Sequence, residues 1–138
     1  MLFDGPHPIP CPLLLVEGWF SKMKGTLPNK MSFLTEMRYF ELQGCQRELS
    51  GTIPNGIGTA WTKVTAFLVN YNHLNGSFPF VNNPLLGTIF LNGNEIDGNL
   101  HSITSLKSLG WLEAEGNKFS GSLPEEITSL ESLCKIMF

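Results

Sequence analysis

One short motif recurs along the chain: a glycine is followed two residues later by a bulky apolar residue and, in four of five copies, by a proline. The copies begin at Gly25, Gly51, Gly76, Gly98 and Gly121, which lie 26, 25, 22 and 23 residues apart. This spacing indicates stacked coils, because a single coil of such length cannot bury its own apolar side chains. Arrays of this kind usually present a surface for binding.

The residues between these glycines follow two apolar periods. Apolar residues recur at every third position from Leu100 to Leu112, which suits a 3₁₀ or irregular turn better than an α-helix. The period then changes to two, which is typical of one short β-strand per repeat. The alternating segments are Phe40-x-Leu42, Phe67-x-Val69, Ile89-x-Leu91 and Leu112-x-Ala114.

The same position after each predicted strand holds a polar or small residue. It is Asn72, Asn94 or Asn117 in three repeats and Cys45 in an earlier one. An asparagine amide contains both donors and an acceptor, so we expect a structural ladder in which each inward-facing amide bonds the backbone of its own coil and of the next. Unpaired, the buried backbone groups would each cost about 1–3 kcal/mol.

Together these positions read L-x-L-x-x-N-x-L-x-G-x-[IL]-P followed by the three-residue period. This pattern resembles the plant-type leucine-rich repeat of receptor-like ectodomains and polygalacturonase-inhibitor-like proteins, and Asn117 to Ile127 match it nearly throughout. The resemblance implies an α/β fold: a right-handed leucine-rich-repeat solenoid with one short parallel strand per coil, short 3₁₀ or irregular convex segments and little true α-helix. It also implies a second, shorter sheet through the Gly-x-Leu-Pro segments.

The repeats also predict the domain organisation. Residues 25–138 are expected to form the solenoid, with about four full repeats and an incomplete last one. Residues 1–24 are expected to form an irregular segment or a degenerate cap, in which Leu14-x-Val16 resembles a weak strand. The interrupted last repeat favours a fragment of a larger receptor-like or secreted protein.

Composition narrows the range of partners. The formal charge is −3 and there is no basic run, which disfavours nucleic acid and anionic membranes. No apolar run approaches the ~18 residues of a spanning helix, so no membrane contact is expected within this segment. The first residues do not read as a secretion signal, since Asp4 and several prolines interrupt them. An extracellular or cell-surface location is therefore favoured only by the resemblance.

The reactive residue types show no arrangement that suits chemistry. The three cysteines, Cys11, Cys45 and Cys134, are too scattered for a disulfide framework and match no zinc motif. The three histidines have no metal-ligand spacing, and no nucleophile with a base and an orienting group can be assembled. We therefore predict a protein that is not an enzyme and has no cofactor or metal.

The candidate binding site is the concave face of the predicted sheet. Alternate strand side chains would point outward there and stack from coil to coil. Aromatic rings beside polar groups are typical of interface hot spots, and the carboxylates favour a basic or hydroxyl-rich partner. The predicted contact residues are Tyr39, Glu41, Gln43, Leu68, Asn70, Tyr71, Phe90, Asn92, Trp111, Glu113 and Glu115.

These features predict a non-catalytic module that binds a protein, peptide or glycan, and two alternatives remain. Small polar residues follow the repeat glycines, so an ice- or polysaccharide-binding solenoid could use a row of Thr26, Thr52, Ser77, Asn99 and Ser122. An inhibitor of a secreted hydrolase would use the concave face and differ only in its partner. Asn75 begins the single N-x-[ST] sequon and is a glycosylation candidate.

Overall fold

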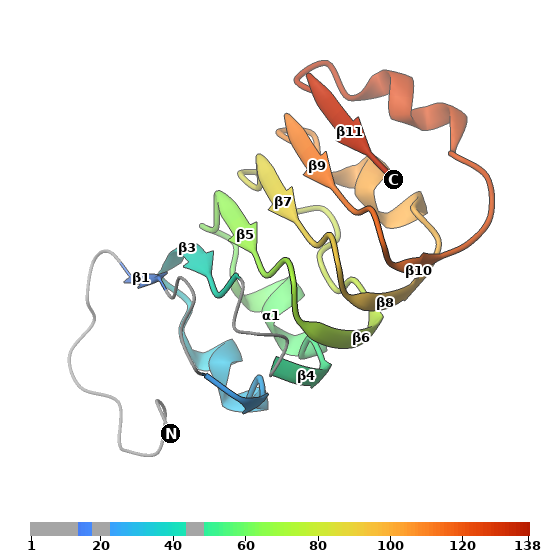
Figure 1. Ribbon diagram of the computed structural model, residues 1–138. Helices are drawn as coiled ribbons and strands as arrows, with labels where there is room; N and C mark the ends of the chain where they lie inside the picture. Colours follow the sequence, from blue (N-terminus) through green and yellow to red (C-terminus); the bar gives the residue numbers. More distant parts are fainter. Residues whose placement is uncertain (1–13, 18–22, 44–48) are drawn as a thin grey trace.

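The structure is a computed structural model that describes residues 14–17, 23–43 and 49–138. Its coils stack side by side and contribute strands to two sheets, each made of parallel strands (Figure 1). The six-stranded sheet has the order β1-β3-β5-β7-β9-β11, and the five-stranded sheet has the order β10-β8-β6-β4-β2. The predicted leucine-rich-repeat solenoid with one short parallel strand per coil is therefore confirmed.

The alternating apolar residues that were predicted to face inward are buried beneath the six-stranded sheet. Phe40, Phe67, Ile89 and Leu112 expose at most 1% of their surface. A strand also forms around Leu14-x-Val16, where it pairs in parallel with β3. The strands are β1 (Leu14–Glu17), β3 (Met37–Glu41), β5 (Ala66–Leu68), β7 (Thr88–Phe90), β9 (Trp111–Glu113) and β11 (Lys135–Met137).

Four of the five strands of the second sheet begin earlier in their repeats than the sequence predicted, and the strand at Gly25–Thr26 lies within the predicted segment. The first four strands of this five-stranded sheet end at the repeat glycine or one residue later, and the last ends before Gly121. The reason is the left-handed backbone of these glycines, with φ of 77° at Gly51 and 73° at Gly76, which turns the chain out of the sheet. The strands are β2 (Gly25–Thr26), β4 (Leu49–Thr52), β6 (His73–Ser77), β8 (Glu95–Gly98) and β10 (Lys118–Phe119).

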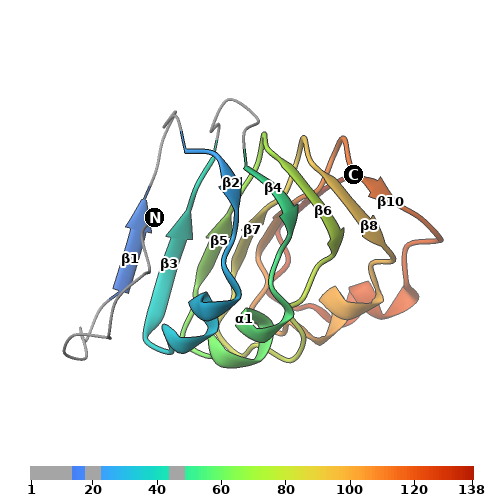
Figure 2. The ribbon, with the colours of Figure 1, turned by 90° about the horizontal axis from the view of Figure 1, so that it is seen from below.

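Short helical turns connect the second sheet back to the first and gather along one side of the stack (Figure 2). Three are 3₁₀ helices and one is a six-residue α-helix within the described ranges, in agreement with the expected scarcity of α-helix. Pro28, Pro54 and Pro124 precede three of them with extended backbone. The turns are η1 (Asn29–Phe33), α1 (Asn55–Ala60), η2 (His101–Ser105) and η3 (Glu125–Ser129).

The coil after Gly76 has no helical turn, and a buried asparagine organises it instead. The Asn83 amide nitrogen donates to the carbonyl of Trp61 at 2.8 Å. Its Oδ1 accepts from the backbone N–H groups of Leu85 and Leu86, both at 3.0 Å. One side chain thus pairs backbone groups that a helical turn would otherwise satisfy.

Aromatic side chains fill the core between the sheets in the middle coils. Trp61 is fully buried, and its indole N–H donates to the carbonyl of Met31 at 3.0 Å. Its ring centroid lies 5.2 Å from that of Phe40 and 6.4 Å from that of Phe80. These contacts join residues from three successive coils, so the core is shared and no coil is closed by itself.

Asparagine amides connect neighbouring coils at the end of the six-stranded sheet. The Asn94 amide nitrogen donates to the carbonyl of Leu91 in its own coil at 2.8 Å and to that of Val69 in the preceding coil at 3.0 Å. Its Oδ1 accepts from the backbone N–H of Leu74 at 3.0 Å. A single side chain therefore satisfies three buried backbone groups in two coils.

Asn117 repeats this arrangement in the next coil, and Asn72 repeats only its donating half, since its Oδ1 has no hydrogen-bond partner. Asn117 donates to the carbonyl of Leu91 at 3.0 Å and accepts from the N–H of Ile96 at 2.9 Å. Asn72 donates to the carbonyl of Leu42 at 2.8 Å. Cys45, which was predicted at the same position one coil earlier, lies outside the described residues.

Replacement of Asn94 by alanine is expected to lower the free energy of unfolding by about 1–3 kcal/mol for each backbone group left buried and unpaired. Asn92→Ala is the matched control, because Asn92 is equally buried in the same coil but its Oδ1 has no hydrogen-bond partner. Urea unfolding followed by circular dichroism measures both variants. Equal losses of stability would contradict the structural role of the Asn94 amide.

Candidate binding surface

Side chains that point away from the core form columns across the six-stranded sheet. The columns are continuous because residues pair without a register shift from β3 to β11. One column holds Tyr39, Ala66, Thr88, Trp111 and Lys135. A second holds Glu41, Leu68, Phe90, Glu113 and Met137, and Gln43, Asn70, Asn92 and Glu115 follow the strands. We call these columns together the outward face.

Trp111 is the centre of a group of contacts on the outward face. The residue is 40% exposed, and its ring meets the ring of Phe90 edge-on, with the centroids 5.1 Å apart. The indole N–H donates to Oε1 of Glu113 at 3.1 Å. Lys135 Nζ lies 4.6 Å from the centroid of the Trp111 ring and 3.2 Å from the same carboxylate oxygen. Three residues, one from each of three strands, thus surround one exposed indole.

A second polar group lies on β3 and the residues that follow it. The Tyr39 hydroxyl donates to Oε2 of Glu41 at 2.7 Å, and the Gln43 amide donates to Oε1 of the same carboxylate. Burial raises the pKa of Tyr39 to about 12, with further contributions from its hydrogen bond to Glu41 and from the charges of Glu41 and Glu17. The Tyr39 hydroxyl therefore stays protonated and orients the carboxylate.

Burial reduces the number of predicted contact residues that a partner could reach. Four predicted contact residues are nearly inaccessible: Glu41 is 2% exposed, Leu68 7%, and Asn70 and Asn92 6% each. Parallel strands lie only about 4.8 Å apart, so side chains of one column cover their neighbours in the next coil. A partner could reach Tyr71 and Trp111 most easily, and then the partly exposed Tyr39, Gln43, Phe90, Glu113 and Glu115.

Tyr71 lies just past β5 in a strained conformation. Its φ is 59°, in the left-handed region, which costs a side chain with a Cβ roughly 1–2 kcal/mol. The next two coils have Gly93 and Gly116 at the same position, with φ of 71° and 64°. A Cβ on Gly93 would lie 2.8 Å from Cδ1 of Tyr71, so this glycine leaves room for the ring. Tyr71 nevertheless remains 50% exposed.

The sequence reasoning missed Lys135 as a member of the face. The signal was present, because Lys135 follows Trp111 by 24 residues, which is one repeat, and pairs with it across β9 and β11. The sequence could not predict that the ammonium group contacts Trp111 and Glu113, because this contact depends on how side chains of neighbouring coils pack.

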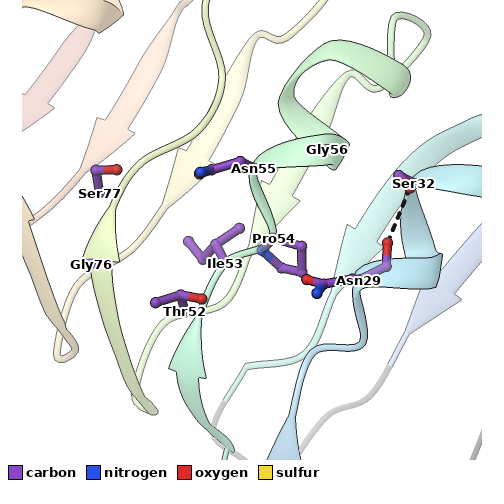
Figure 3. A pocket seen from close by; sticks show the side chains of 9 residues that line it. All are labelled: Asn29, Ser32, Thr52, Ile53, Pro54, Asn55, Gly56, Gly76 and Ser77. Carbon is purple, nitrogen blue, oxygen red and sulfur yellow. Dashed lines mark hydrogen bonds between the residues drawn. The ribbon is translucent and has the colours of Figure 1, made fainter.

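The five-stranded sheet presents the alternative surface. Thr26, Thr52, Ser77, Asn99 and Ser122 are all exposed, but the pairing staggers them, since Thr26 lies beside Ser50 and Thr52 beside Asn75. A hollow of about 500 Å³ includes Thr52 and Ser77 (Figure 3). It also contains Asn29, Ser32 and Asn55 from the neighbouring turns. The offset is two residues at each step from Thr26 to Asn99, so these side chains form an oblique row and do not stack directly from coil to coil.

The remaining predicted features have clear positions. Asn75 is exposed on β6, where its side chain is accessible for modification. Cys134 is an exposed free thiol, whereas Cys11 lies outside the described residues. Across the described ranges, no three or more His, Cys, Asp or Glu side chains gather as a metal site. Nor does any helix there have the length and apolarity to cross a bilayer.

Comparison with known sequences gives one receptor. No protein-family profile matches the chain. The receptor protein-tyrosine kinase CEPR1 of Arabidopsis thaliana is 30% identical over 89 residues, which are 62% of this chain and 9% of that protein. The chain therefore spans about a tenth of the length of this relative.

Solved structures similar to the chain are plant receptor ectodomains. The structure of PEPR1-AtPEP1 matches with a TM-score of 0.73 and 23% identity, over 83% of this chain and 16% of that one. The plant peptide hormone receptor RGFR1 in complex with RGF2 matches with a TM-score of 0.67 and 27% identity, over 88% and 18%. The leucine-rich-repeat ectodomain of the receptor kinase SOBIR1 from Arabidopsis thaliana matches with a TM-score of 0.65 and 24% identity. The match covers 80% of this chain and 59% of that one.

Tyr71→Gly is expected to be more stable than Tyr71→Ala by about 1 kcal/mol, because only glycine relieves the left-handed strain once the ring is gone. Thermal or urea unfolding of the two variants measures the difference. Ala60→Gly in α1 is the control and should be destabilising, as glycine usually is within a helix. A Tyr71→Ala variant as stable as Tyr71→Gly would show that φ relaxes and that no strain is stored.

The raised pKa of Tyr39 predicts a loss of stability at high pH. Its value in the folded state, about 12, exceeds the ordinary 10.0, so its contribution to stability is complete below pH 10 and is lost as the pH rises towards 12. The tyrosinate absorbance of the protein minus that of Tyr39→Phe gives the titration of this group. Glu41→Gln should lower the pKa of Tyr39, and an unchanged titration in that variant would contradict the assigned contacts.

Proposed function

We propose that this chain, a leucine-rich-repeat solenoid of the plant receptor type, is a non-catalytic module that binds a peptide or protein partner on the outward face of its six-stranded sheet. The proposed module comprises residues 25–138, and β1 extends the same sheet. One of the similar solved structures is a plant peptide hormone receptor, RGFR1, in complex with RGF2, which supports a peptide as the partner.

The observation that carries this proposal is the exposed indole of Trp111 on a continuous face. Large aromatic side chains that are accessible but flanked by polar groups contribute most of the binding free energy in many interfaces. Trp111 is 40% exposed and is held in place by Phe90 and Glu113, so little conformational entropy would be lost on binding. Tyr71 adds a second exposed ring, at the end of β5.

The polar groups on this face suit recognition better than catalysis. The Tyr39–Glu41–Gln43 and Trp111–Glu113–Lys135 groups each contain a carboxylate with donors around it, and neither contains a serine, cysteine or histidine. An extracellular location is part of the proposal, and the accessible Asn75 sequon is compatible with it. A glycan or a secreted hydrolase would occupy the same face and would be distinguished by the test below.

Binders selected from a random peptide library displayed on phage should depend on Trp111. Trp111→Ala is expected to weaken the selected peptides by about 30-fold or more, as removal of a hot-spot residue does. Phe33→Ala is the matched control, because this aromatic residue is 65% exposed but belongs to η1, outside the six-stranded sheet. Affinities are measured by isothermal titration calorimetry.

Three results would go against the proposed peptide site. Selected peptides that tolerate Trp111→Ala but are lost with Thr52→Tyr would place binding on the five-stranded sheet. Failure of the library, with retention of plant cell-wall oligosaccharides on an array, would make the partner a glycan. Capture and inhibition of a purified secreted polygalacturonase would make it a hydrolase.

A further inference from the structure

Lys135 occupies a place on the outward face that is well suited to a cation. Its Nζ lies 4.6 Å from the centroid of the Trp111 ring and 3.2 Å from Oε1 of Glu113. The indole N–H donates to the same oxygen at 3.1 Å, which holds the carboxylate beside the ring. An aromatic ring with a carboxylate beside it forms a site that attracts ammonium and guanidinium groups.

The ring is positioned independently of the lysine. Phe90 meets it edge-on at a centroid distance of 5.1 Å, and Glu113 binds its N–H. The site for a cation therefore persists when the ammonium group leaves. Lys135 gains little by staying, because its side chain is 46% exposed and ion pairs open to water are weak.

The charges on the face favour a basic ligand. Among the described residues of the outward face, Lys135 is the cation, whereas Glu113, Glu115 and the nearly buried Glu41 are acidic, and Glu17 on β1 pairs with Glu41. A partner with arginine or lysine would complement these charges, and an acidic partner would be repelled. Glu115, two residues after Glu113, adds a second partly exposed carboxylate on the same coil.

We propose that an arginine or lysine side chain of the bound peptide lies on Trp111 and pairs with Glu113, in the place that Lys135 fills when no ligand is bound. This inference rests on the proposed function, since it gives the chemistry of the ligand at that same site. Arginine is the stronger candidate, because a guanidinium can stack on the indole and bind the carboxylate with two donors. Lys135 then competes with the cationic side chain of the ligand for the place on Trp111 and Glu113.

The test uses a minimal probe, Nα-acetyl-arginine amide, titrated into the protein while the NMR signal of the Trp111 indole N–H is followed. The signal is assigned by its loss in Trp111→Phe. Lys135→Ala should bind the probe about two- to fivefold more tightly than the unmodified chain, because the competing cation–π contact is removed. Adding Glu113→Gln to this variant should abolish the saturable shift, and Nα-acetyl-glutamate amide should give none.

Lys118→Ala is the matched control, because Lys118 is also exposed and bound to a glutamate, Glu95 at 2.8 Å, but lies on the five-stranded sheet. The Lys118→Ala variant should bind the probe with the same affinity as the unmodified chain. Lys135→Gln, which keeps most of the side-chain length, replaces Lys135→Ala if circular dichroism shows that alanine unfolds the last coil.

Equal affinities of Lys135→Ala, Lys118→Ala and the unmodified chain would overturn the inference, and so would binding that survives Glu113→Gln. Either result leaves the proposed function intact if selected peptides still depend on Trp111. Conversely, a probe site that depends on Glu113, together with selected peptides that ignore Trp111, would refute the proposed function and keep the cation site.

Discussion

The buried asparagine amide is the interaction on which the rest of the structure depends. Asn94 pairs the backbone of two coils with one side chain, and Asn117 and Asn72 connect the coils on either side. Where the chain leaves a parallel strand, particular groups such as the carbonyls of Val69 and Leu91 are paired by these amides, and orphaned groups in the interior would be costly. The amides therefore allow the chain to turn inside the stack, which keeps successive strands in register.

Register, in turn, produces the candidate binding face. Because residues pair without a shift from β3 to β11, each outward side chain meets its counterpart one coil away. The same closeness that builds the columns also buries part of them, including Glu41 and Leu68. What remains accessible is a set of protruding groups, of which Trp111 with Glu113 and Lys135 is the best defined. The proposed cation site is thus a consequence of coil stacking.

Two departures from the repeat show how local strain and local polarity are accommodated. Tyr71 adopts a left-handed φ of 59° where neighbouring coils have glycine, and Gly93 leaves room for its ring. A strained residue that stays half exposed gives little to the core, which supports a role at the surface. Asn83, in contrast, is buried and has a structural role. It replaces a helical turn by pairing the backbone N–H groups of Leu85 and Leu86.

The sequence alone determined the solenoid, the inward positions of Phe40, Phe67, Ile89 and Leu112, and the phase of the asparagines, because each follows from a period of two or of about 24 residues. Periodicity states which way a side chain points, but it does not state what covers it. The tertiary structure alone decided that Glu41 and Asn92 are buried, that the hydroxyl row is staggered, and that Lys135 lies on Trp111. The physical reason is that these outcomes depend on contacts between side chains a full repeat apart, which form only when neighbouring coils are packed together.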